Sequence, residues 1–267
     1  CTLVGAGHRL LEGQRFSTLF IDEAAQALEA ACWIPIRRVS RVILAGDHCQ
    51  LPPTVKGMAA LKGGLGKTLM ERVVENKPEC VTLLQVQYRM KDEIMRFSSE
   101  WFYGGKVETA PQVRDRSILD LDYAFTWVDT SELDSDEDEP LFKEQFVGES
   151  YGRVNKGEAI LTLTTLQDYL GKIGKQRILD ERIDVGVISP YRAQVQYLKQ
   201  LIRKSDFFKP YRHLITVNTV DGFQGQERDI ILISMVRSNA DGQIGFLSDL
   251  RRMNVAITRA RMKLIIL

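Results

Sequence analysis

Two adjacent carboxylates, Asp22 and Glu23, directly follow an apolar run at residues 18–21. The run is β-branched, aromatic and aliphatic, which predicts a parallel strand covered on both faces. Ligands of such sheets bind beyond the carboxyl ends of the strands. One acid could therefore hold Mg²⁺ while the other orients or deprotonates an attacking water, as phosphoryl transfer requires. A structural alternative stays open, because Asp22 could instead cap a helix that begins near Ala24.

A second apolar run, at residues 41–45, ends in Gly46 and Asp47, and Gln50 follows in the same segment. If the two strands are neighbours, these side chains meet the earlier carboxylates at one edge of the sheet. A glutamine amide there can hydrogen-bond a γ-phosphate or the attacking water. A purely structural turn, made by the glycine and the two prolines that follow, would account for those residues but not for the presence of a glutamine between them.

The composition is that of a globular protein able to form one large or two modest domains, with 267 residues, 44% hydrophobic and 27% charged. The formal net charge of +1 means that any nucleic-acid binding must use local basic patches. The four cysteines and three histidines show neither CxxC pairing nor zinc-site spacing, which indicates reduced thiols in an intracellular protein, cytoplasmic or nuclear. No apolar run approaches the roughly 20 residues of a membrane span, so no membrane role is expected.

Strand candidates alternate with segments of helical periodicity, which predicts an α/β fold with parallel sheets flanked by helices. The expected strands are residues 18–21, 41–45, 81–84, 125–128, 183–189, 214–217, 229–236 and 262–267. Two segments interrupt the alternation. Residues 131–140 are strongly acidic and predict a mobile surface loop, either a tolerated insertion or a dock for a basic protein partner. Residues 171–182 are charged and predict a connector.

A series of sequence blocks resembles, in kind and order, the motifs of superfamily 1 helicases of the up-frameshift and senataxin type. The blocks are residues 1–7, 19–26, 46–53, 85–90, 189–194, 217–227 and 252–261. The resemblance implies two RecA-like domains, an incomplete first one at residues 1–84 and a second at residues 85–267. It also implies a monomer that hydrolyses ATP between the two domains and moves 5′ to 3′ along a single strand.

The resemblance assigns roles at the ATP site residue by residue. It implies that Asp22 holds Mg²⁺, that Glu23 activates water and that Gln50 senses the γ-phosphate. Arg89 and Arg259 resemble the two arginines that reach ATP from the second domain. A planar guanidinium offers paired donors to phosphate oxygens, which suits that task.

Further nucleotide contacts follow from the same resemblance. Gly46 and Asp47 belong to the nucleotide site. Glu227 would contact the ribose, and Gly225 would allow the backbone to approach closely.

The strand-binding residues come from the same motifs. The resemblance implies that single-stranded RNA or DNA passes Thr2, Pro53, Pro190, Tyr191, Arg192, Thr219 and Val220. Contacts of this kind mostly touch the sugar-phosphate backbone and tolerate many sequences, so they do not separate RNA from DNA.

A basic cluster at residues 199–213 surrounds Phe207, Phe208 and Tyr211. It could form a stacking and phosphate platform for nucleic acid. Alternatively, the aromatic side chains simply pack the end of the helix that begins at Tyr191.

The phosphate-binding pattern GxxxxGK[ST] is not matched in this chain. Residues 63–68 end like one, but Leu61 stands where the first glycine is required and no apolar strand precedes it. Lys67 is therefore interpreted as structural or solvent-facing, and residues 69–72 as the start of a helix. Because the chain starts at Cys1, we expect it to be a piece of a longer protein whose phosphate loop lies upstream, and to be inactive alone.

Two other functions would use parts of the same residue set. A helicase-like module could bind nucleic acid or protein without hydrolysis, but such a clamp would not need Asp22, Glu23, Gln50, Arg89 and Arg259 together. A metal nuclease built on the two acids would need further clustered acids or histidines.

Overall fold

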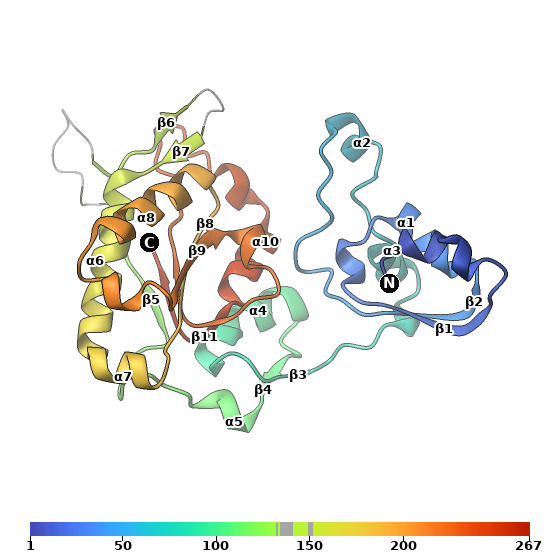
Figure 1. The fold of residues 1–267 in the computed structure, drawn as a ribbon, viewed down its shortest axis with the longest axis horizontal. Coiled ribbons are helices and arrows are strands. Elements are labelled where there is room, and N and C mark those ends of the chain that lie inside the picture. The colour runs from blue at the N-terminus through green and yellow to red at the C-terminus, as the bar shows by residue number, and fades with distance from the viewer. Residues whose placement is uncertain (132, 134–140, 149–151) are drawn as a thin grey trace. The chain divides into compact units, whose positions relative to one another are not determined.

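A computed structural model describes residues 1–131, 133, 141–148 and 152–267 of the chain. It divides into two compact units, Cys1–Leu83 and Leu84–Leu267. Both contain parallel strands with helices packed against them (Figure 1), which confirms the predicted α/β class. Most of the acidic segment predicted as a loop at residues 131–140 lies outside the described residues.

The first unit is built on two parallel strands, β1 (Phe16–Ile21) and β2 (Val39–Leu44), which pair so that Ile21 lies beside Leu44. Helix α1 (Glu29–Ile36) connects them, and α2 (Met58–Lys62) and α3 (Leu69–Asn76) follow. Single 3₁₀ turns lie at Gly5–Gly7, Arg9–Leu11, Ala24–Gln26 and Pro78–Cys80. A small core around Ile21 fixes the carboxyl ends of both strands.

Two expectations for this unit are wrong. Strand β1 is covered on one face only, because Phe20 points away from the core and is 71% exposed. Residues 81–84 form no strand, since within the described chain this apolar segment has no neighbouring strand with which to pair. Apolar composition favours a strand, but a strand also needs a partner for its backbone groups.

The second unit is organised around a five-stranded parallel sheet in the order β5-β11-β10-β8-β9. The strands are β5 (Phe125–Trp127), β8 (Val185–Ser189), β9 (Ile215–Thr219), β10 (Arg228–Ile233) and β11 (Ala260–Ile266), close to the predicted ranges. The central strands β8 and β10 are almost entirely buried, which explains their continuous apolar runs.

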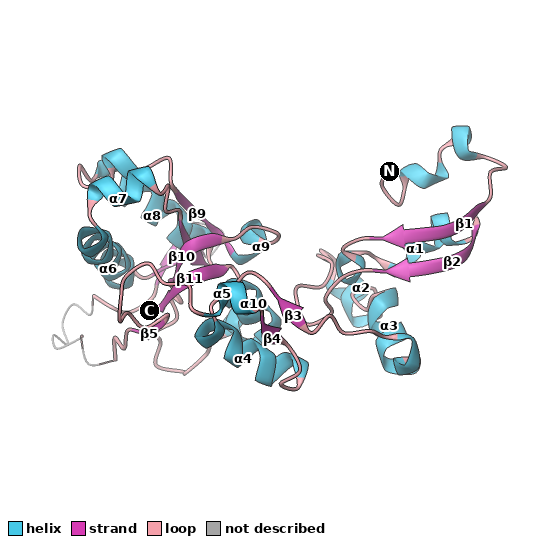
Figure 2. Ribbon diagram, turned by 90° about the horizontal axis from the view of Figure 1, so that it is seen from below, coloured by secondary structure: helices cyan, strands magenta, loops and turns pink. Residues whose placement is uncertain are grey.

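Helices cover both faces of this sheet. In Figures 1 and 2, α6 (Lys156–Ile173) and α8 (Arg192–Lys204) lie on one side and α4 (Asp92–Tyr103) and α10 (Leu250–Ile257) on the other. Shorter helical segments are α5 (Pro111–Arg114), α9 (Val220–Phe223) and 3₁₀ turns at Lys209–Tyr211 and Gly245–Ser248. None of the helices in the described ranges is both long and apolar enough to cross a membrane.

The predicted connector at residues 171–182 is wrong, because most of it is helical. Helix α6 continues to Ile173, Gly174 breaks it at φ 88°, and α7 (Lys175–Asp180) follows. The charged side chains form the outer face of α7, while Ile178 is buried. The sequence analysis also missed two short pairs, β3 (Val86–Gln87) with β4 (Glu108–Thr109) and β6 (Gln145–Val147) with β7 (Gly152–Val154), which are too short to show a period.

A buried carboxyl group joins α6 to the segment after β10. Glu158 is 4% exposed, and its side chain accepts hydrogen bonds from the Ser234 hydroxyl at 2.5 Å and from the Val236 amide at 2.9 Å. Burial raises the pKa of Glu158 to about 7, although both hydrogen bonds act in the opposite direction. In the unfolded chain this group titrates near its ordinary value of 4.5.

The raised pKa of Glu158 predicts a pH-dependent stability. Between the unfolded and folded pKa values the folded state binds the extra proton, so the free energy of unfolding should fall as pH rises from 5 to 8. Urea unfolding across this range measures it, with Glu158→Gln as the matched control. The Gln variant should lack this component, and identical pH profiles for the two proteins would contradict the assignment.

Candidate functional site

The parallel pairing of β1 and β2 brings two turns together at one sheet edge. The Ala45 amide donates to the Ile21 carbonyl and the Ala24 amide to the Ala45 carbonyl, each at 2.8 Å. The segment after β1 carries Asp22 and Glu23, and the segment after β2 carries Gly46 and Asp47. The sequence prediction that these strand ends share an edge is therefore confirmed.

Asp22 and Glu23 are both exposed at this edge. Asp22 Oδ1 accepts a hydrogen bond from the Glu23 amide at 3.0 Å, and the turn at Ala24–Gln26 has no side-chain cap. The alternative that Asp22 only caps a helix is therefore wrong. Glu23 has φ 51°, a left-handed conformation that is uncommon for glutamate. Strained backbone of this kind is concentrated at functional sites. Its Oε2 accepts a hydrogen bond from Gln26 at 2.7 Å, which orients the carboxylate.

Asp47 organises the second turn. Its Oδ1 accepts the Cys49 amide at 2.9 Å and its Oδ2 accepts the Gln50 side-chain amide at 2.8 Å. Gln50 is thereby held on the same turn as Asp47, with both side chains partly buried. Pro53 follows in the loop that leads to α2.

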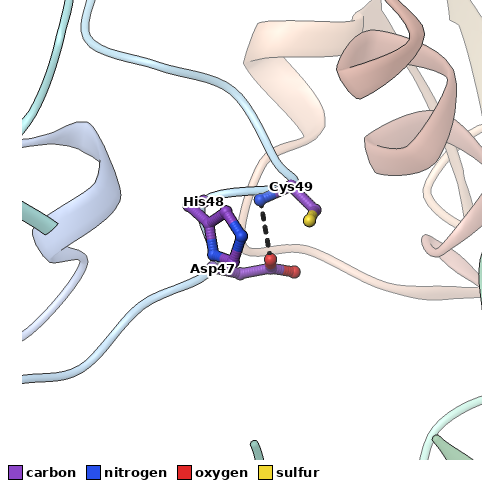
Figure 3. Close-up of side chains that lie close together, drawn as sticks. All are labelled: Asp47, His48 and Cys49. Atoms are coloured by element: carbon purple, nitrogen blue, oxygen red, sulfur yellow. Dashed lines mark hydrogen bonds between the residues drawn. The ribbon is translucent and has the colours of Figure 1, made fainter. Parts of the chain in front are cut away.

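Donor atoms of Asp47, His48 and Cys49 lie within 4.8 Å of one another (Figure 3). A thiolate, an imidazole and a carboxylate together suit zinc better than Mg²⁺, which prefers oxygen ligands. Both Asp47 oxygens already accept hydrogen bonds within the turn. The exposed carboxylate of Asp22 therefore fits Mg²⁺ better than this cluster does.

Gly46 lets the two turns approach. A Cβ at this position would lie 3.0 Å from the amide nitrogens of Ala24 and Ala25. Backbone atoms cannot give way as a flexible side chain can.

Gly46→Ala should destabilise the first unit by about 1–3 kcal/mol, the usual cost of overpacking. Urea unfolding followed by the fluorescence of Trp33, with Trp101 and Trp127 replaced by phenylalanine, isolates this unit. Gly57→Ala is the matched control, because a Cβ there makes only an ordinary 3.7 Å contact. Equal stability of the two alanine variants would rule out the proposed close approach.

In the second unit, Arg89 is held by a cluster of polar groups. Its Nε donates to Glu227 Oε2 at 2.5 Å and its Nη1 to the Thr258 carbonyl at 3.0 Å. The side chain of Gln87 accepts the Arg89 amide at 2.8 Å and so fixes the backbone there. Glu227 also lies 3.7 Å from Arg261, so two arginines share this carboxylate.

Arg259 is 2% exposed and donates inward. Its guanidinium contacts the carbonyls of Val255 at 2.8 Å and Gln226 at 3.2 Å, and the Thr258 hydroxyl at 2.8 Å. The structure therefore places Arg89, Glu227 and Arg259 in one region, since Arg89 and Arg259 both contact Thr258. Gly225 lies nearby with φ 75°, a conformation that favours glycine.

Sequence reasoning gave no role to Arg261 or to the two aspartates beside it. Arg261 lies 3.0 Å from both Asp184 and Asp229. Burial raises the pKa of Asp229, and Arg261 opposes that rise. The sequence did offer one indication of this cluster, because Arg261 lies two residues after Arg259 in the same motif.

The predicted strand-binding residues fall into two sets. Thr2 and Pro53 lie in the first unit, where the Thr2 hydroxyl accepts the Gly5 amide at 3.0 Å. In the second unit β8 and β9 pair so that Ser189 lies beside Thr219. Pro190, Tyr191, Arg192, Thr219 and Val220 therefore follow neighbouring strand ends.

Two of these residues are not surface groups. Tyr191 and Val220 are buried, whereas Arg192 is exposed. Thr219 caps α9, because its hydroxyl accepts the Gly222 amide at 3.3 Å. Of the other residues in this set, Arg192 is exposed and Pro190 and Thr219 are partly exposed.

Of the two interpretations left open for residues 207–211, the aromatic platform is wrong. Phe208 and Tyr211 are buried in the main core, and Phe207 packs against them with ring centroids at 5.2 and 5.6 Å. Arg212 donates to carbonyls at the end of α8, including Ser205 at 3.2 Å. The alternative, that these residues pack the end of the helix, is confirmed.

The interpretation of Lys67 is also confirmed. Its ammonium group forms an ion pair with Glu75 of α3, and the side chain is partly exposed. Thr68 begins α3 through a capping box with Glu71.

The fold and the site together define an α/β protein with acidic and amide side chains gathered at the carboxyl edge of a parallel sheet, the usual location of ligand sites in this class. Models described as "AAA domain" match residues 65–267 and 1–58, so the chain belongs to the AAA-domain family.

Curated relatives extend this result. The chain is 38% identical over 98% of its length to an uncharacterized ATP-dependent helicase of Methanocaldococcus jannaschii, covering 37% of that protein. It is 36% identical over its full length to the DNA polymerase alpha-associated DNA helicase A of Schizosaccharomyces pombe, covering 39%. It is 35% identical over its full length to a Regulator of nonsense transcripts 1 homolog of Neurospora crassa, covering 24%. The predicted relationship to helicases is confirmed, and the chain spans well under half of these relatives.

Proposed function

We propose that this chain forms part of an ATP-dependent superfamily 1 helicase of the up-frameshift and senataxin type, which moves along single-stranded nucleic acid. The observation that carries the proposal is the junction of the turns after β1 and β2, which places exposed Asp22 and Glu23 beside the turn of Asp47 and Gln50. The relatives named as helicases support the same activity.

The acidic turn would supply the metal and water chemistry. The carboxylate of Asp22 would hold Mg²⁺, which neutralises phosphate charge when bound. Glu23, oriented by Gln26, would accept the proton of the attacking water. Gln50, fixed by Asp47, offers an amide to a phosphate oxygen or to that water.

The second unit would contribute the cationic side of the same reaction. Arg89 already has an anionic partner in Glu227 at 2.5 Å, so a phosphate would compete with that carboxylate for its guanidinium. Arg259 is 2% exposed and makes three inward hydrogen bonds, so its planar guanidinium would have to turn away from them to donate to a phosphate. Glu227 would then be released toward the ribose, beside the backbone of Gly225.

The strand would pass the ends of β8 and β9 in the second unit, and Thr2 and Pro53 in the first. We propose single-stranded RNA or DNA as the partner and 5′ to 3′ as the direction, both from the resemblance stated above. Relatives named as a DNA helicase and as a regulator of nonsense transcripts fit either nucleic acid.

The 267-residue chain alone should show no ATP hydrolysis stimulated by a single strand, because it contains no GxxxxGK[ST] pattern to hold phosphates. A phosphate-release assay with and without oligouridylate measures this. Robust turnover that Glu23→Gln abolishes would show that another segment binds the phosphates and would refute the expectation.

A further inference from the structure

Arg237, in the segment that follows β10 (which ends at Ile233), is a buried cation at which three segments meet. Its side chain is 6% exposed, and its Nε lies 2.7 Å from Oε2 of Glu144, which is equally buried. Its Nη1 donates to the Tyr191 hydroxyl at 3.3 Å. One guanidinium thus joins the residue before β6, the residue before α8 and the segment after β10.

A fourth segment, the loop before α10, packs against the Arg237 guanidinium. Gly245, in the loop before α10, has φ 55°, and a Cβ there would lie 2.9 Å from the Tyr191 hydroxyl and closer still to Arg237. No side chain larger than hydrogen fits at this position without moving one of the two. The loop before α10 is therefore seated directly on the pair of Arg237 and Tyr191.

The backbone that presents Arg237 is itself constrained. The preceding residue, Val236, has φ 72°, an outlier for a β-branched side chain. The buried carboxylate of Glu158 accepts the Val236 amide at 2.9 Å and so supports this conformation. The Glu144 amide also donates to the Ser238 carbonyl at 3.1 Å, so backbone and side-chain contacts join the same two segments.

Stability alone does not explain this arrangement. A buried ion pair often stabilises a fold no better than apolar residues of the same size, and its best-attested use is to select one arrangement. Strained non-glycine backbone concentrates where geometry matters for function. This cluster fixes the side chain of Tyr191. Tyr191 lies between Pro190 and Arg192, in the segment proposed to contact the nucleic-acid strand.

We propose that Arg237 is a positioning residue for single-strand binding, whose buried guanidinium holds Tyr191, the Glu144 segment and the loop at Gly245 in the one arrangement that presents Arg192 to the strand. The inference rests on the proposed nucleic-acid function and adds residues outside the recognised motifs. Because it is buried, Arg237 itself does not pair with a phosphate.

The test is the affinity of the 267-residue chain for fluorescein-labelled oligodeoxythymidylate and oligouridylate, measured by anisotropy over a range of salt concentrations. Arg237→Lys keeps the charge but loses the fork that contacts Glu144 and Tyr191 together. It should weaken binding about tenfold or more, and the slope of log affinity against log salt should fall about as much as in Arg192→Gln, because the misplaced Arg192 no longer contacts a phosphate. Tyr191→Phe should also weaken binding, and should add little in the Arg237→Lys background.

Arg177→Lys is the matched control, since Arg177 lies on α7 at the other end of this unit (Figure 1). Circular dichroism confirms that each variant is folded. Unchanged affinity of a folded Arg237→Lys protein would overturn the inference, as would a further fall in the salt slope when Arg192→Gln is added to it, which indicates that Arg237 contacts a phosphate of its own. Failure of the unmodified chain to bind either oligonucleotide would instead refute the proposed function itself.

Discussion

Replacing Arg259 by alanine should lower the kcat for ATP hydrolysis by about 10³- to 10⁵-fold, the range that arginine fingers supply. The assay uses a protein that joins this chain to a phosphate-binding loop. Single-strand affinity should change little, because Arg259 contacts Val255, Thr258 and Gln226, which belong to α10, the residue after it and the segment before β10. Turnover and strand binding should therefore separate.

Arg259 is also structural, and the experiment must distinguish the two roles. Its loss leaves the carbonyls of Val255 and Gln226 without this donor, which should cost about 1–3 kcal/mol of stability. Arg259→Lys keeps the charge and much of the volume but not the fork, so it should fold better and still lack turnover. Arg177→Ala on α7 is the control. Wild-type turnover in a folded Arg259→Lys protein would show that the residue is structural only.

Glu23→Gln should reduce ATP turnover by about 10²- to 10⁴-fold, the usual contribution of a general base. The amide keeps the size of the side chain and can still pair with Gln26, so ATP affinity and fold should be preserved. Single-turnover hydrolysis and equilibrium binding of a fluorescent ATP analogue measure the two effects separately.

Glu29→Gln provides the matched control for that substitution. Glu29 lies in the same unit but pairs with Arg72 at 2.6 Å, away from the strand ends. Its variant should hydrolyse ATP normally. If Glu23→Gln and Glu29→Gln retain equal activity, the water-activating role of Glu23 is wrong.

The ends of the strands could be predicted, because a buried strand is an apolar run and its end is marked by the first polar residues after that run. Asp22 and Asp47 follow paired strands in the structure, as their positions after two such runs indicated. Residues 81–84 show where this reasoning fails, since an apolar run cannot reveal whether another strand is available to pair with it. Strands β6 and β7 do pair but were not predicted, because three residues are too few to show the alternation of a strand.

Side-chain partners could not be read from the sequence in the same way. The ion pair between Arg89 and Glu227 joins residues 138 positions apart and depends on how β10 and α10 pack. Likewise, motif spacing gives no sign that Tyr191 contacts Arg237 and lies against the loop at Gly245. Motif spacing indicates which residues share a region, but only packing decides which are exposed.

The most direct test of the central claim is the rate of ATP hydrolysis, with and without a single strand, by a protein that joins this chain to a phosphate-binding loop. We predict hydrolysis that depends on Mg²⁺, rises when oligouridylate or oligodeoxythymidylate is added, and disappears in Glu23→Gln. If that protein binds both ATP and the strand but hydrolyses no ATP, or hydrolyses it equally well without Glu23, the proposed role of the acidic turn after β1 is contradicted.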